Sequence, residues 1–136
     1  MNSFELLIQD LSTLLGIPLH AEKGYLCRLI AQGSLKVHLE HEPDLHRILI
    51  ASFVCEIPPG KFREDILKEA LKSNDSLDRL GTLAYSEKNN SLAYFLYLQE
   101  DTAPNSVSSI LLGFIDTAKA WKTAVETGQM HLIARH

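Results

Sequence analysis

The chain has 136 residues, of which 46% are hydrophobic and 22% charged, and its net charge is −4 with a pI near 5.8. These values are typical of one globular domain with its own core, and they exclude an intrinsically disordered chain. The acidic balance argues against nucleic acid or anionic lipid as a partner, because both require a basic surface. It also disfavours acidic partners, so a basic or neutral polypeptide is the easier ligand.

We expect neither a membrane span nor a signal peptide. No stretch reaches the roughly 18 uncharged apolar residues that a spanning helix needs. Glu5 and Asp10 interrupt the apolar N-terminus, which has no basic segment before it. Cys27 and Cys55 both lie in apolar strand candidates, and we interpret them as buried thiols in a reducing compartment. The sequence therefore predicts a cytoplasmic protein.

The first predicted element is a helix over residues 4–15. Its apolar residues recur three or four positions apart on one face, and Leu6 lies off that face. Ser3 can cap the first turn, and Gly16 supplies the left-handed residue that commonly ends a helix.

Three strands follow, over residues 25–31, 35–42 and 48–57. In the second, Leu35, Val37 and Leu39 alternate with polar residues and are predicted to face the core. The third is apolar at most positions, which predicts a strand covered on both faces. Short turns join the three strands into a meander.

A second helix is predicted over residues 62–72, after Pro58-Pro59-Gly60 has ended the third strand. Its apolar stripe is narrower than a core helix usually carries. Either an internal neighbour or a second copy of the chain could cover this stripe, which consists of Phe62, Ile66, Leu67, Ala70 and Leu71.

Two further strands, residues 82–86 and 92–99, precede a long final helix that ends at Gly128. The strand at 92–99 is again apolar on both faces. The residues that could cap the final helix are Asp101, Thr102 and Asn105. Residues 1–128 form the predicted domain, and the mildly apolar tail at 129–136 is either docked or frayed.

The predicted order is α-β-β-β-α-β-β-α. This order indicates a single α+β domain with helices packed on a twisted antiparallel sheet. Two strands that are apolar on both faces, together with the off-stripe Leu6, leave a surplus of apolar surface. That surplus favours a binding or dimerising module.

Residues suited to catalysis are few. His38, His41 and His46 are the nearest approach to a metal site, but strand alternation places the first two on opposite faces. We interpret all three as solvated histidines of a hairpin. No predicted helix N-terminus is placed where it could lower the thiol pKa of Cys27 or Cys55. No phosphate-binding or nucleophile-elbow motif is present.

Several strings, in their combined order and spacing, resemble the class I chaperones of type III secretion, the Tir chaperone (CesT-like) family. The resemblance covers residues 4–128. Its carriers are LLGIPL at 14–19, GYLC at 24–27, IPPGKFREDILKEALKSN at 57–74, GTLAYSEKNNSLAYFLYL at 81–98 and the final helix as far as Trp121.

The resemblance implies a non-catalytic cytoplasmic bacterial chaperone without metal or cofactor, which binds a segment near the N-terminus of a secreted effector or gate protein. It also implies a homodimer, or a heterodimer with a second chaperone. The implied dimer interface consists of Phe62, Ile66, Leu67, Ala70, Leu71, Leu83 and Tyr85. The implied cargo-binding residues are Leu6, Leu26, Ile30 and Leu35.

Two alternatives remain. One is a regulatory module of the same fold that acts on a component of transcription. The other is a small thiol or metal enzyme that uses Cys27 or the histidines at 38–46.

Overall fold

A computed structural model of the chain describes residues 1–77 and 79–129. The described residues form three α-helices and five strands in the predicted order, and a short 3₁₀ turn, η1 (Pro43–Leu45), joins two of the strands. The other elements are α1 (Ser3–Leu15), β1 (Leu26–Ala31), β2 (Leu35–Glu42), β3 (Arg47–Glu56), α2 (Lys61–Asn74), β4 (Thr82–Ser86), β5 (Ser91–Gln99) and α3 (Pro104–Thr127). The predicted tail beyond residue 129 lies outside the described residues.

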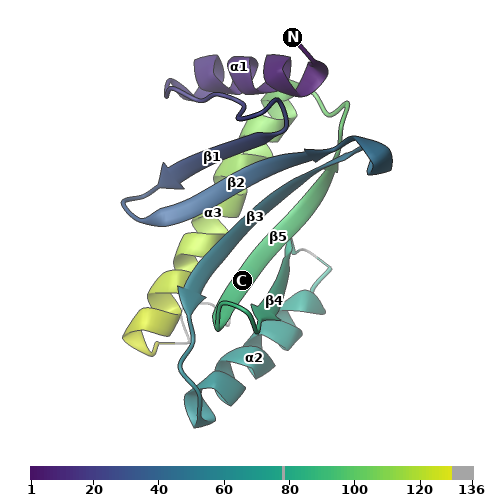
Figure 1. Cartoon of the computed structure of the whole chain (residues 1–136). Helices are drawn as coiled ribbons and strands as arrows, with labels where there is room; N and C mark the ends of the chain where they lie inside the picture. The colour runs from purple at the N-terminus through teal and green to yellow at the C-terminus, as the bar shows by residue number, and fades with distance from the viewer. Residues whose placement is uncertain (78, 130–136) are drawn as a thin grey trace.

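The strands form one antiparallel sheet in the order β1-β2-β3-β5-β4 (Figure 1). The first three strands make the predicted meander. The chain then leaves the sheet through α2, and β4 returns at the far edge, so that β5 pairs with both β3 and β4. The two strands with the most continuous apolar sequence, β3 and β5, thus lie side by side at the centre of the sheet.

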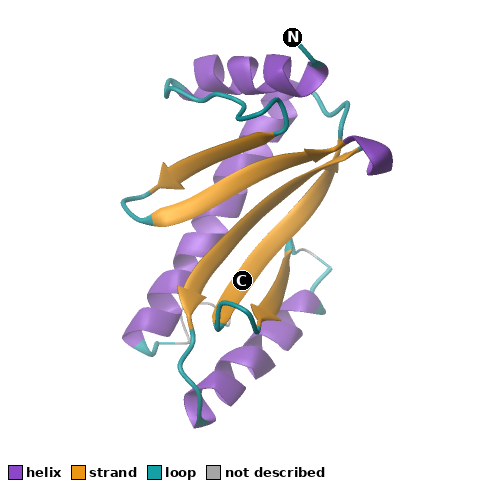
Figure 2. Ribbon diagram, in the orientation of Figure 1, coloured by secondary structure: helices purple, strands orange, loops and turns teal. Residues whose placement is uncertain are grey.

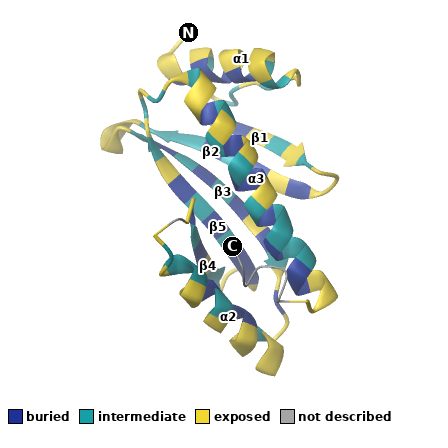
Figure 3. Ribbon diagram, turned by 180° about the vertical axis from the view of Figure 1, so that it is seen from behind, coloured by how far each residue is buried: buried dark blue, intermediate teal, exposed yellow. Residues whose placement is uncertain are grey.

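Helices α1 and α3 lie on one face of the sheet, and α3 crosses that face diagonally (Figures 1 and 3). Helix α2 lies beside the edge strand β4 instead of over the sheet (Figure 2). In the described chain, therefore, no helix covers the second face. The prediction that residues 48–57 are covered on both faces is wrong for the single chain, because β3 alternates between buried and more exposed positions.

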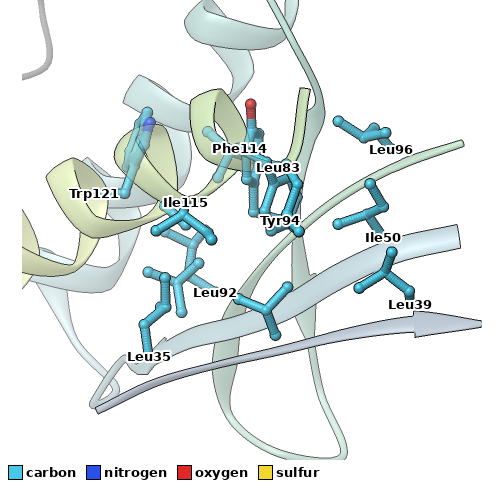
Figure 4. Close-up of a cluster of buried hydrophobic side chains, with 14 of the residues drawn as sticks. Leu35, Leu39, Ile50, Leu83, Leu92, Tyr94, Leu96, Phe114, Ile115 and Trp121 are labelled. Carbon is cyan, nitrogen blue, oxygen red and sulfur yellow. The ribbon is translucent and has the colours of Figure 1, made fainter. Parts of the chain in front are cut away.

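The core lies between α3 and the sheet. Phe114 of α3 stacks on Tyr94 of β5 with ring centroids 4.7 Å apart, and both side chains are buried (Figure 4). The predicted inward-facing residues of β2, Leu35, Val37 and Leu39, are buried in the same layer. Burying one large aliphatic side chain stabilises the fold by about 1.5–3 kcal/mol. This layer is therefore the main source of stability within one chain.

The N-terminal ends of two helices differ in detail from the prediction. Asn2, not Ser3, caps α1: its side-chain oxygen accepts from the Glu5 N–H at 2.8 Å, while the Glu5 carboxylate accepts from the Asn2 N–H at 2.9 Å. Helix α3 begins after Ala103 without a side-chain cap. Pro at the first helical position has no N–H that needs an acceptor, so this helix requires less capping. Gly16 and Gly128 end α1 and α3 in the left-handed region, as predicted.

The helices of the described ranges include none that is long and apolar enough to cross a membrane.

Candidate protein-binding surfaces

The face of the sheet opposite α3, called the open face below, is apolar along its central strands. Side chains of β3 and β5 pair directly across it, Leu49 with Tyr97 and Ala51 with Phe95. Phe53 extends the row and is 52% exposed. Cross-strand pairs of this kind stabilise a sheet modestly, but they leave their outer surfaces in contact with water. An uncovered apolar face of this extent indicates a protein-binding surface.

A groove of about 730 Å³ opens at one end of this face, where the β1–β2 hairpin diverges from β3. Pairing between β2 and β3 begins only at His38 with Ala51, so the hairpin end of β2 is not joined to β3 by a regular ladder. A β-bulge follows Phe53 and bends the end of β3. The buried Ser52 hydroxyl donates to the Lys36 carbonyl at 2.7 Å and ties the two strands together where they separate. The groove is named the β2–β3 groove below.

The predicted cargo-binding residues lie in three different places. Leu26 and Ile30 lie together in the β2–β3 groove, and Ile30 is 67% exposed. Leu6 is exposed on the outer surface of α1 and does not line the groove. Leu35 is buried in the core layer and offers no surface to a partner. The sequence reasoning missed Phe53, although alternation from the buried Ile48 and Ile50 would have placed it on the opposite face.

Charged side chains surround the apolar floor of the groove. Arg28 pairs with Glu22 at 3.2 Å, and Lys122, from α3, pairs with Glu126 at 3.6 Å. Lys36 is exposed and forms no ion pair within the described residues.

Two titratable groups of β2 also line the groove. Burial lowers the pKa of His38, which Glu40 partly opposes. His38 is therefore uncharged at neutral pH, and Glu40 is the one carboxylate among the lining residues.

Helix α2 is fixed beside β4 by polar contacts that sequence periodicity does not reveal. The Asn74 side chain donates to the Leu83 carbonyl at 2.8 Å and accepts from the Leu83 N–H at 2.9 Å. At the other end, Arg63 donates to the Ile57 carbonyl at 2.7 Å and places its guanidinium 5.0 Å from the centre of the Tyr85 ring. The Asn74 contacts satisfy edge groups of β4, and together with the Arg63 contacts they orient one side of α2 toward the sheet.

The predicted dimer residues consequently divide between the inside and the outside of the single chain. Ile66, Ala70 and Leu83 are buried where α2 meets β4. Leu67 and Tyr85 are half-buried. Phe62 and Leu71 remain exposed, Leu71 at 67%. The narrow stripe of α2 is thus covered on one side by its own domain, and its outer side, with Leu77 in the loop that follows, is open.

The groups proposed for catalysis show no activation. Burial raises the pKa of each thiol, Cys27 and Cys55, to about 11, so both stay protonated at neutral pH. In the described part of the chain, no group of three or more His, Cys, Asp or Glu side chains suits a metal ion.

The interpretation of all three histidines as solvated is wrong for His41. Its Nε2 donates to the Glu100 carboxylate at 2.9 Å, its ring stacks on Phe4, and its side chain is only 13% exposed. His46 donates to the same carboxylate at 3.0 Å. These two hydrogen bonds lower the pKa of Glu100. The cluster therefore connects α1, β2 and η1 to the residue that follows β5.

The family model that describes the Tir chaperone protein (CesT) family matches residues 6–122. The chain belongs to this family. No curated protein matches the chain. The family assignment and the predicted α-β-β-β-α-β-β-α order are therefore both confirmed.

Solved structures share the fold of this family member. A chain of the HopA1–SchA chaperone–effector complex has a TM-score of 0.73 and 18% identity, with 90% of this chain and 94% of that chain covered. A chain of the ExsC–ExsE complex has a TM-score of 0.69 and 14% identity, with 90% and 92% covered. A chain of the complex between the Yersinia pestis type III secretion chaperone SycH and a stable fragment of YscM2 has a TM-score of 0.63 and 18% identity. The match covers 85% of this chain and 96% of that chain.

Proposed function

We propose that this protein is a non-catalytic cytoplasmic chaperone of type III secretion. It binds the chaperone-binding segment of a secreted effector or gate protein and keeps that segment soluble until secretion. The observation that carries the proposal is the open face, an apolar sheet surface left uncovered in a member of the Tir chaperone family. Fold relatives captured as chaperone–effector complexes support it.

The cargo surface is assigned to the open face and the β2–β3 groove. Leu26, Ile30 and Phe53 provide apolar contacts there, and β1 is an edge strand beyond which no further strand is paired in the described chain. An extended segment can add its backbone to such an edge while its alternate side chains enter the groove. Leu6, on the outer surface of α1, is a second contact if the segment continues around the domain.

The dimer surface is assigned to the outer side of α2. Phe62 and Leu71 are exposed there, with the half-buried Leu67 and Tyr85 beside them. Stable interfaces bury a cluster of apolar residues at their centre, and this patch has the required composition. Ile66, Ala70 and Leu83 support the patch from within each subunit.

Affinity capture from the native host, followed by mass spectrometry, tests the proposed function. We expect recovery of a secreted effector or gate protein, with loss of recovery when Ile30 and Phe53 are both changed to Asp. Recovery of a transcription component would establish the regulatory alternative instead. Light scattering on the purified protein measures its oligomeric state, and a partner-free monomer would refute the assigned dimer surface.

A further inference from the structure

The β2–β3 groove differs in charge from the protein as a whole. The chain carries a net charge of −4. The groove, in contrast, is lined by three permanent cations, Arg28, Lys36 and Lys122, and by one carboxylate, that of Glu40. His38, also in the lining, is uncharged at neutral pH because burial lowers its pKa. The electrostatic potential inside a groove depends on the charges that line it, so it can attract a ligand that the net charge of the protein would repel.

The charges of the groove are ordered along β2. Lys36 and Glu40 project from the same face because side chains on a strand alternate. Four residues of strand separate them by about 13 Å. The register places the exposed Ile30 opposite Lys36 and Leu26 opposite Glu40. The hairpin end of the groove is therefore apolar with a positive charge, and the other end is apolar with a negative charge.

The cations differ in how free they are. Arg28 and Lys122 are each already paired with a glutamate, at 3.2 and 3.6 Å. Lys36 has no ion-pair partner among the described residues. A carboxylate that enters at the hairpin end can therefore pair with Lys36 without displacing an existing partner. The side chain of Lys122 is only 17% exposed, so water screens its charge less than that of a surface lysine.

From this geometry we propose that the groove selects an extended cargo segment with alternating apolar residues and with acidic residues before or after them. The acidic residues lie at the hairpin end of the groove. This inference rests on the proposed function and specifies the chemistry of its ligand. It reverses the expectation from net charge, which disfavours acidic partners. A basic residue at the hairpin end would lose this pairing and be repelled by Lys36.

Two synthetic peptides test the proposal on the full chain. Both carry the segment Val-Ser-Val-Ser-Leu, preceded by two glutamates in one peptide and by two uncharged glutamines in the other. Fluorescence anisotropy at low salt measures their affinities. Since Lys36 offers one exposed ion pair, we expect up to about fivefold tighter binding of the acidic peptide. The preference shrinks at high salt because mobile ions screen it.

Charge reversal locates the effect. Lys36→Glu removes most of the preference for the acidic peptide, whereas Lys88→Glu, in the exposed turn between β4 and β5, changes the net charge equally and leaves it intact. Both positions are exposed, so thermal melting should be unchanged.

Equal affinities for the two peptides, the same effect of both substitutions, or binding of neither peptide would overturn the proposal. Recovery of an effector from the host would stand in each of these cases, so failure of the groove's selectivity is distinguishable from failure of the proposed function.

Discussion

The two faces of the sheet carry similar kinds of apolar side chain and differ in what covers them. On one face, Tyr94 is buried against Phe114 of α3. On the other, Phe53 and Tyr97 have no helix above them and remain about half exposed. The difference shows that, within a single chain, one face of an apolar strand can be covered by a helix while its other face stays exposed to solvent. The first face explains stability, and the second indicates binding.

Helix α2 repeats the same contrast on a smaller scale. Its inner residue Ile66 is fully buried against the β4 edge, and its outer residue Leu71 is two-thirds exposed. Stability and association should therefore respond to different substitutions on the same helix.

The largest effect is expected from Ile66→Asp. This substitution places an unpaired carboxylate at a site with 0% exposure and removes a packed side chain, so we expect a loss of several kcal/mol of unfolding free energy. The protein should unfold rather than dissociate. Leu71→Asp is the matched outer variant and should keep the melting temperature while converting dimers to monomers. Circular dichroism with size-exclusion light scattering measures both, and an unchanged mass for Leu71→Asp would remove α2 from the interface.

Phe114→Ala and Phe53→Ala compare the two faces of the sheet directly. Truncation of a fully buried Phe costs about 3–5 kcal/mol, so Phe114→Ala should shift the urea midpoint strongly. Phe53 is half exposed, and its truncation should cost less than about 1.5 kcal/mol. Cargo capture should show the reverse order, with the larger loss for Phe53→Ala at temperatures where both variants are folded. Equal losses of unfolding free energy for the two variants would mean that Phe53 is buried and that the open face is covered.

Asn74→Ala tests whether α2 belongs to the single-chain fold. The substitution leaves the Leu83 N–H and carbonyl without their partner, which costs about 1–3 kcal/mol for buried polar groups. We expect a lower urea midpoint and faster amide exchange in β4, with β1 and β2 unaffected. Asn105→Ala, at an exposed position in the first turn of α3, is the control and should be neutral. If amide exchange in β4 is unchanged, another contact must hold α2 in place.

Periodicity predicted most of this fold because the signals are local. The α1 stripe, the alternation of Leu35, Val37 and Leu39 and the long stripe of α3 each specify both an element and its buried side. Gly16 and Gly128 ended helices where expected, since a left-handed residue is a local requirement.

The binding surfaces could be predicted only in part because they depend on relations across the chain. Alternation in β3 separates Ile50 from Phe53 but does not say which face receives a helix. The groove depends on where β2 diverges from β3, and the His41–Glu100 pair joins residues 59 positions apart. Leu35 shows the limit of analogy: the family resemblance implied a cargo contact, and the fold places this residue in the core.

The smallest expected effect is a pH dependence that originates on the open face. Burial lowers the pKa of His38 below its ordinary 6.5, so the unfolded chain takes up a proton at this site before the folded chain does. The free energy of unfolding should therefore fall as pH drops below about 6.5. Urea titrations at pH 7.5 and 5.5 should show a smaller decline for His38→Gln than for the wild type, and the exposed His20→Gln should retain the wild-type decline. Glu100, whose pKa is lowered by its two histidine partners, should add a second decline only below about pH 4.5. If His38→Gln and His20→Gln behave alike above pH 5, then His38 is solvated and the apolar environment assigned to the groove is incorrect.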